Sequence, residues 1–228
     1  MRLRERFMET IDGGKVLVTS GPTRAYIDRI RFVSNTSTGV LGARIIETLV
    51  GRHIPVVHVR GYGAAEPGVA DSSLLESIEV VTVDDLVETM EQVAVQGEVR
   101  AVVHAMAVLD YVPESRMQGK IPSGQDSWTI RLIRTPKVIA RMRELLPEAF
   151  FTGFKLEAGV TEKELVERAG FLLDSHRLDC VVANDLDLVN DVMHEALFVA
   201  PGNTVIARAH TKREIAEILT GLIMERLG

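Results

Sequence analysis

Short runs of branched apolar residues alternate along the chain with longer segments in which apolar residues recur every three or four positions. The short runs predict buried strands, and the longer segments predict helices with one apolar face. The strands expected are residues 15–19, 54–59, 78–83, 101–108, 150–156 and 180–183, and the helices are expected to begin near residues 38, 84, 136, 161 and 211. This alternation predicts an α/β protein with a doubly wound, mostly parallel sheet.

Capping residues indicate where these helices begin and end. Ser37 or Thr38 is available as the N-cap of the first helix, which should end near Gly51. Pro136 stands at the favoured first position of another helix. Two sequences of the capping-box type open the last two helices, the first of which should end near His176: Thr161 with Glu164, and Thr211 with Glu214.

Two segments interrupt the alternation. Between residues 110 and 127 the pattern gives way to prolines and glycines, and residues 128–134 then alternate as an exposed strand does, so a flap of about residues 110–135 is expected. Residues 196–200 and 204–207 flank Pro201-Gly-Asn203 and predict a C-terminal hairpin at a sheet edge. Together the elements predict one modified Rossmann-like domain over residues 1–228, and such sheets bind ligands beyond the carboxyl ends of their strands.

Composition narrows the classes of function. The net charge is -6 and no run of Lys and Arg occurs, so nucleic acid is not an expected partner. The longest apolar runs are well short of the ~20 residues that span a bilayer. Residues 1–12 mix arginines with glutamates and lack the apolar stretch of a secretory signal, so a cytoplasmic location without membrane contact is expected. The single cysteine, Cys180, is interpreted as a buried strand residue.

Glycines cluster where the first strand gives way to the first helix. Residues 19–23 follow the strand, and Gly39 and Gly42 stand at the helix start after Ser37. Glycine lets backbone amides approach an anion, and the helix dipole favours the anion's charge, so a phosphate site is one interpretation. Close packing of the helix is the other interpretation, and the local pattern leaves both open.

Two polar side chains are further candidates for chemistry. Asp110 follows small residues after a predicted central strand, where a base and ribose could lie against the backbone, although a loop-capping carboxylate is the alternative. Lys120 stands in the flap, from which a lysine can swing onto a developing phosphate charge, and a solvated loop lysine is the alternative. The six histidines show no paired helical spacing, so no metal site built by the protein alone is expected.

A nicotinamide site is the main rival for the first strand and helix. A dinucleotide fingerprint needs its glycines in one tight turn, whereas about 18 residues separate Val18 from Ser37 here. Arg60, at the end of the second strand, is the residue that such a site would use for a 2′-phosphate, and an ordinary surface arginine is its alternative.

The motifs together resemble the phosphopantothenate–cysteine ligase family, over about residues 15 to 222. The most specific stretch is similar to the family's Gly-Gly-Thr, Ile-Asp-x-Val-Arg and Ser-Asn-x-Ser-x-Gly pattern, and here it is Thr19-Ser-Gly-Pro-Thr-Arg with Ile27-Asp-Arg-Ile-Arg-Phe-Val-Ser-Asn35-Thr-Ser-Thr-Gly39. Supporting blocks follow in the family's order: Met106-Ala-Val-Leu-Asp110-Tyr, Lys120-Ile, Arg134-Thr-Pro-Lys, Gly153-Phe-Lys-Leu-Glu157 and Val182-Ala-Asn-Asp185. The chain looks most like the stand-alone bacterial form, which is not fused to the flavin-dependent decarboxylase.

The resemblance implies a two-step reaction of coenzyme A biosynthesis. The carboxylate of 4′-phosphopantothenate attacks the α-phosphate of CTP to give an acyl-cytidylate and pyrophosphate, and the amine of L-cysteine then displaces CMP. Mg²⁺ would arrive with the triphosphate, no flavin is expected, and ATP is a possible alternative to CTP. The resemblance also implies a homodimer and a separate phosphopantothenoylcysteine decarboxylase acting next. An NADP-dependent reductase and a non-catalytic nucleotide-binding protein are the rival functions.

The resemblance assigns roles residue by residue. Asn35 would hold the acyl intermediate, and Lys120 would stabilise phosphate charge as the flap closes. The substrate-binding residues implied are Ser37, Gly39, Gly42, Ala107 and Asn184. The nucleotide-binding residues implied, besides Lys120, are Ala105, Met106, Asp110, Pro136, Lys137, Val138, Ile139, Phe154, His176 and Arg177.

The chain departs from the family pattern at three places. The family's first Gly-Gly pair is Gly21-Pro22 here, and the Lys-x-Lys-Lys motif of the fused enzymes keeps only Lys120. Two family lysines that contact the triphosphate are replaced, one of them by His176 or Arg177 and the other by an apolar residue. These departures bear on which nucleotide is bound and how tightly.

Overall fold

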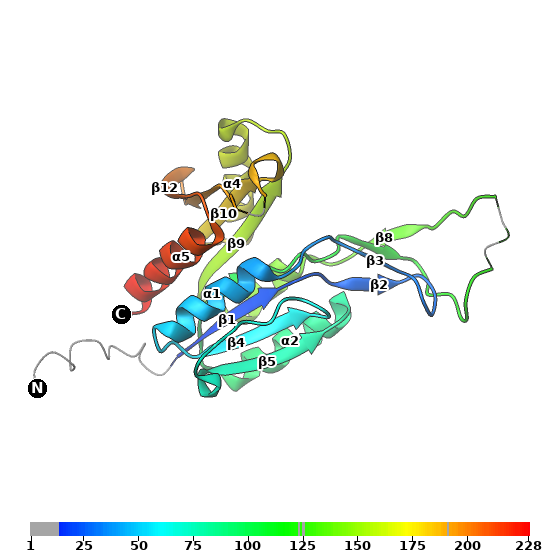
Figure 1. Ribbon diagram of the computed structural model, residues 1–228, viewed down its shortest axis with the longest axis horizontal. Helices are drawn as coiled ribbons and strands as arrows, with labels where there is room; N and C mark the ends of the chain where they lie inside the picture. Colours follow the sequence, from blue (N-terminus) through cyan, green and yellow to red (C-terminus); the bar gives the residue numbers. More distant parts are fainter. Residues whose placement is uncertain (1–13, 123, 125, 191) are drawn as a thin grey trace, which may run out of the picture.

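The structure is a computed structural model that describes residues 14–122, 124, 126–190 and 192–228. Its centre is one eight-stranded sheet in the order β12-β11-β10-β9-β6-β1-β4-β5, in which the strands from β10 to β5 run parallel and β11 runs antiparallel to both neighbours (Figure 1). The predicted doubly wound, mostly parallel α/β fold is confirmed. The strands are β1 (Lys15–Ser20), β4 (Val56–Gly61), β5 (Leu75–Val80), β6 (Val99–His104), β9 (Phe150–Glu157), β10 (Cys180–Asp185), β11 (Ala196–Ala200) and β12 (Thr204–Ala209).

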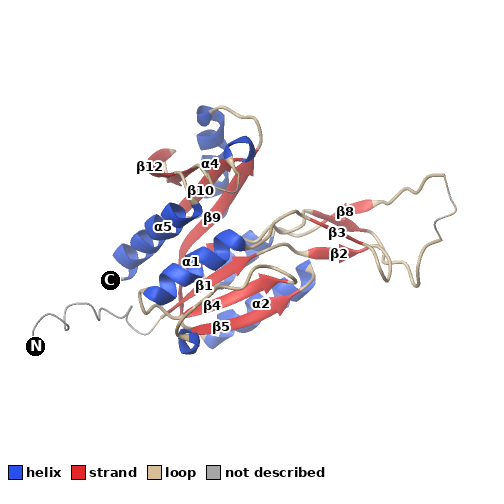
Figure 2. Cartoon of the chain, viewed as in Figure 1, coloured by secondary structure: helices blue, strands red, loops and turns tan. Residues whose placement is uncertain are grey.

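Helices cover both faces of this sheet (Figure 2). One face carries α1 (Val40–Gly51) and α5 (Lys212–Leu227), and the other carries α2 (Val83–Gln96), α3 (Val138–Leu145) and α4 (Glu162–His176).

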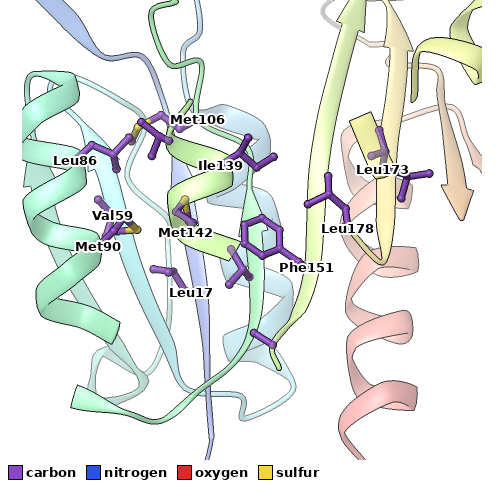
Figure 3. Packing of buried hydrophobic residues seen from close by; sticks show 14 of the residues in the cluster. Leu17, Val59, Leu86, Met90, Met106, Ile139, Met142, Phe151, Leu173 and Leu178 are labelled. Carbon is purple, nitrogen blue, oxygen red and sulfur yellow. The ribbon is translucent and has the colours of Figure 1, made fainter. Parts of the chain in front are cut away.

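Burial along β1 explains why a central strand is apolar at successive positions. Val16 and Val18 pack under α1 and α5, whereas Leu17 points into the opposite layer, among side chains of α2 and α3 (Figure 3). Cys180 lies in the same cluster as Val16 and is 1% exposed, which confirms it as a buried strand residue.

The C-terminal hairpin lies at the edge of the sheet, as predicted. The turn between the paired residues Ala200 and Thr204 has three residues, and the last two, Gly202 and Asn203, have φ of 76° and 58°, a left-handed conformation that glycine and asparagine adopt more readily than other residues. Within the described residues, no helix combines the length and hydropathy needed to cross a membrane. The arginines and glutamates of residues 1–12, on which the absence of a secretory signal was argued, lie outside the described residues.

Two small ribbons extend from the sheet as an arm, which comprises residues 24–34 and the described residues of 111–134 (Figure 1). One ribbon pairs β2 (Arg24–Tyr26) with β3 (Phe32–Ser34), and the other pairs β7 (Tyr111–Pro113) with β8 (Leu132–Arg134). The strands expected from the sequence include none between residues 19 and 54, and the first ribbon shows that two were missed there. The amide of Thr135 donates to the carbonyl of Asp110 and closes the second ribbon at its base (2.9 Å).

Asp28 explains why the first ribbon was missed. One carboxylate oxygen accepts from the amides of Ile30 and Arg31 at 2.8 and 2.7 Å, and the other accepts from the amide of Ile121 in the second ribbon at 3.2 Å. Burial would raise the pKa of Asp28, but these amides and the charge of Arg31 outweigh burial and lower it. A turn organised by one carboxylate leaves no trace in apolar periodicity.

Several strands end at other residues than predicted. A run of apolar residues indicates that a segment is buried, but it does not show which of its residues pair with a neighbouring strand. The strand expected at 78–83 is β5, which ends at Val80 because Thr82 caps α2. The strand expected at 101–108 ends at His104, and Met106 beyond it is a buried loop residue. The exposed strand expected at 128–134 is confined to Leu132–Arg134.

Helix starts were predicted with mixed success. Thr161 and Glu164 form the complete capping box, and α4 ends at His176 as expected. Thr211 accepts from the amide of Glu214, but the Glu214 carboxylate accepts from the amide of His210, so the second box is only half formed. Two helix starts were placed wrongly: α3 begins at Val138, two residues after Pro136, and α1 is capped by Gly39 rather than by Ser37 or Thr38.

Candidate functional site

The site lies at the carboxyl ends of β1 and β6, where the chain order of the sheet reverses. The segments that leave these two strands run side by side, since the amide of Ala105 donates to the carbonyl of Thr19 (3.0 Å) and the amide of Ala107 donates to that of Gly21 (2.9 Å). The loop that leads to α1 is therefore held against the residues that follow β6.

The larger of two clefts at this edge has a volume of about 680 Å³. Its walls come from the loop and first turn of α1, the segment after β6, the end of β9, and the connection from β10 to β11. The residues predicted for the substrate and its intermediate all line it: Asn35, Ser37, Gly39, Gly42, Ala107 and Asn184.

The first turn of α1 presents free amides to the larger cleft. The N-cap, Gly39, has no side chain to accept a hydrogen bond, and the first turn carries no acidic residue. Gly39 has a φ of 75°, and a Cβ there would lie 2.8 Å from the Ala64 Cβ, so glycine is needed for conformation and for space. A Cβ on Gly42 would collide with Ser20, which supports the packing interpretation for Gly42 without contradicting anion binding.

Asn35 connects the α1 loop to the segment after β6. Its Nδ2 donates to the carbonyls of Ala107 and Val108 at 3.1 and 3.3 Å. The amide donors are thereby used within the protein, and the Oδ1 atom remains as an acceptor in the wall of the larger cleft.

The smaller cleft, with a volume of about 150 Å³, lies beside the first and shares Met106 and Phe154 with it. The start of α3 forms one wall, and the ammonium of Lys137 forms an ion pair with Asp110 at its rim (2.6 Å). Apolar side chains supply most of its lining. Seven residues predicted for the nucleotide line this cleft: Met106, Asp110, Pro136, Lys137, Val138, Ile139 and Phe154.

The remaining nucleotide candidates lie elsewhere. Ala105 lines the larger cleft. His176 ends α4 and Arg177 follows in a left-handed conformation, and neither lines the smaller cleft. His176 still acts there electrostatically: burial first, and then the charge of His176, lower the pKa of His104 to about 4. Burial and then the charge of Lys137 lower the pKa of His176 in turn.

Lys120 is not brought to either cleft. It is an exposed residue of the arm, which extends from the body of the protein (Figure 1).

His194 and Lys212 are among the polar residues of the larger cleft that sequence reasoning missed. His194 precedes the two hairpin strands at the edge of the sheet, and Lys212 follows them. No functional motif in the sequence marks either residue. His104 also lines the smaller cleft and was not among the predicted site residues; its Nδ1 lies 2.7 Å from the Thr19 hydroxyl.

Comparisons with known proteins agree on one family. The profile described as "DNA/pantothenate metabolism flavoprotein C-terminal domain" matches residues 11–227. The bifunctional coenzyme A biosynthesis protein CoaBC of Thermococcus kodakarensis is 35% identical over 217 residues, which are 95% of this chain and 52% of that protein. The chain thus spans about half the length of the curated relatives that it matches.

Solved structures show the same fold. The DNA/pantothenate metabolism flavoprotein from Streptococcus pneumoniae superposes with a TM-score of 0.85 at 31% identity, over 93% of this chain and 99% of that one. A histidine variant of Cab2 in complex with phosphopantothenate-cysteine superposes with a TM-score of 0.75 over 94% of this chain and 88% of that one, and at 20% identity that likeness concerns the fold alone.

Proposed function

Since the chain belongs to the family of the DNA/pantothenate metabolism flavoprotein C-terminal domain, we propose that it is a nucleotide-dependent ligase of coenzyme A biosynthesis that joins L-cysteine to 4′-phosphopantothenate. The pair of adjoining clefts carries this proposal. The N-terminus of α1 lines the larger cleft, and the N-terminus of α3 lines the smaller one. Since a helix N-terminus favours a phosphate, two phosphorylated ligands can meet at the wall that the clefts share, formed by Met106 and Phe154. The names of the curated relatives support the same pathway.

The proposed reaction has two displacements. The pantothenate carboxylate attacks the α-phosphorus of CTP, its oxygen forms the new P–O bond, and pyrophosphate leaves. The amine of cysteine then attacks the acyl carbon, loses a proton, and expels CMP. The chain supplies positioning and charge neutralisation, because activation replaces a poor leaving group with a good one.

The clefts suggest how the ligands are arranged. The phosphate of phosphopantothenate would lie at the amides of Gly39 to Gly42, and its carboxylate end would reach the wall shared with the smaller cleft. The base and ribose would lie between the apolar walls of the smaller cleft, with Asp110 accepting from a ribose hydroxyl. Asn35 would hold the acyl intermediate between the two clefts.

Mg²⁺ fits the smaller cleft only as a companion of the triphosphate. Asp110 is the carboxylate that lines it, and no group of three His, Cys, Asp or Glu side chains within the described residues forms a metal site. Mg²⁺ in nucleotide sites is commonly held by one or two carboxylates and the phosphates themselves, and it supplies charge neutralisation there.

A single assay tests the function. Pyrophosphate release is measured with phosphopantothenate, Mg²⁺, and either CTP or ATP, with and without cysteine. We expect release with CTP, and CMP and phosphopantothenoylcysteine only when cysteine is added. Absence of pyrophosphate release with both nucleotides would refute the ligase function. In a separate titration, binding of NADPH would support the reductase. Nucleotide binding without turnover would support a non-catalytic protein.

Lys120→Gln should slow the activation step by roughly a hundredfold or more, because Lys120 would neutralise the transferring phosphate when the arm closes over the nucleotide. The fold should be unaffected, since Lys120 is exposed. The measurement is the single-turnover rate of pyrophosphate release. Lys163→Gln is the matched control, because Lys163 is an exposed lysine of α4 outside both clefts. Full activity of Lys120→Gln would remove the proposed role.

We propose that the chain forms a homodimer through the arm. The arm exposes apolar side chains, with Phe32, Trp128, Leu132 and Ile133 each 41–43% exposed. Light scattering should give twice the chain mass of 25.1 kDa. The double variant Leu132→Asp/Ile133→Asp should give one chain mass, and a monomeric, fully active wild type would contradict the proposal.

A further inference from the structure

Among the described residues that line the larger cleft, Lys212 is the one with a charged side chain. It is the first residue of α5, which packs beside α1, so that both helices begin at this cleft (Figure 1). No described carboxylate lines the cleft to offset the ammonium. The larger cleft is therefore electropositive within a chain of net charge -6.

The ammonium of Lys212 is not committed elsewhere. No ion pair joins it to another residue of the described chain, whereas its neighbour Arg213 pairs with Glu217 at 2.8 Å. The acidic residue in the first turn of α5, Glu214, is engaged by the amide of His210. Lys212 is half-buried, so a ligand that met its ammonium would be partly shielded from water.

Two buried polar side chains beside Lys212 also lack partners. Asn184 is 6% exposed, and no hydrogen bond joins its carboxamide to another residue in the described part of the chain. His194 is 8% exposed, and its Nδ1 has no hydrogen-bond partner. Both line the larger cleft, and buried polar groups without partners are rare unless a ligand or water completes them. Burial and then the nearby Lys212 ammonium lower the pKa of His194 to about 4, so that imidazole is neutral and leaves Lys212 as the cation.

We propose that Lys212 is a phosphate-binding residue, which pairs with the phosphate monoester of the substrate held at the first turn of α1. This inference rests on the proposed function and adds to it a specificity determinant from a second helix that begins at the cleft. The amides of α1 supply neutral donors, and Lys212 supplies the full charge that distinguishes a dianionic monoester from an uncharged alcohol. The nucleotide is not its ligand, because Lys212 lines the larger cleft and not the smaller.

The test compares two ligands that differ only in the phosphate. Calorimetric affinities of the wild type and Lys212→Met are measured for 4′-phosphopantothenate and for pantothenate. Removal of one charged hydrogen-bonding partner should weaken phosphopantothenate binding roughly ten- to a hundredfold. Pantothenate binding should not change. In turnover, the KM for phosphopantothenate should rise while kcat and the KM for the nucleotide stay constant, and Lys212→Arg should recover part of the affinity.

Arg213→Met is the matched control, since it removes a neighbouring cation of α5 that lies outside the larger cleft. It should bind both ligands as the wild type does. If the wild type bound phosphopantothenate more tightly than pantothenate and Lys212→Met kept the same ratio of affinities, this inference alone would be overturned. A wild type that does not distinguish the two ligands would overturn the proposed substrate and this inference together. Equal weakening of both ligands in Lys212→Met would assign Lys212 a structural role and also overturn the proposal.

Discussion

Replacing Asn35 by aspartate should reduce ligation by roughly a hundredfold or more while leaving the chain folded. The two Nδ2–H donors that hold the α1 loop to the carbonyls of Ala107 and Val108 would become a carboxylate oxygen facing two carbonyl oxygens. Two lost hydrogen bonds and the repulsion together amount to about 3 kcal/mol. The new charge would also repel an anionic substrate in the larger cleft. Pyrophosphate and CMP release, measured separately, identify the step that is lost.

Asn190→Asp separates the effect of charge from that of the lost donors. Asn190 also lines the larger cleft, but its side-chain oxygen accepts from the amides of Val192 and Met193, and a carboxylate can accept the same two bonds. If Asn190→Asp were as inactive as Asn35→Asp, repulsion alone would explain both. Normal rates of CMP release in Asn35→Asp, with an unchanged melting temperature, would show that Asn35 does not handle the intermediate.

Local and periodic features explain why the body of the fold was predictable. The capping box of Thr161 and Glu164 is encoded within four residues, and both of its bonds form. The successive apolar residues of β1 follow from burial on two faces. The first ribbon of the arm depends instead on Asp28, whose carboxylate joins residues more than ninety positions apart, and no periodicity carries that information.

The candidate site divides in the same way. The loop of α1 and the segment after β6 each follow a strand, so the rule that ligands bind at carboxyl ends of strands predicts this edge of the sheet, and the family resemblance supplied Asn35 and Ala107 themselves. Lys212 reaches the same cleft only because α5 packs on α1 after the hairpin has turned the chain back. A lysine at a helix start is common in any sequence, and only the packing of distant elements shows that this one lines a cleft.

Acidification from pH 7 to pH 5 should remove a large share of the folding stability. Burial first, and then a neighbouring positive charge, lower the pKa of His58, His104 and His194 to about 4. The unfolded chain binds protons at these histidines near pH 6.5, so the stability they contribute is complete above that pH and is lost as the pH falls toward 4. Each histidine should cost roughly 2 kcal/mol at pH 5, or about 6 kcal/mol together, against the 5–15 kcal/mol typical of a domain.

Urea unfolding at pH 7 and pH 5 measures the loss, and His58→Gln assigns it. The His58 ring is fully buried and its Nε2 lies 2.8 Å from the Ser20 hydroxyl, so Gln keeps a polar group there but cannot take up a proton. The variant should be less stable at pH 7, yet it should lose roughly 2 kcal/mol less than the wild type between the two pH values. Asp28, whose pKa is lowered from 3.8, does not titrate in this window. His53→Gln, at an exposed position, should keep the wild-type difference. The two variants differ in whether the imidazole that each removes is buried. If His58→Gln also kept the wild-type difference in stability between pH 7 and pH 5, protonation of the buried His58 would not be the cause of the loss.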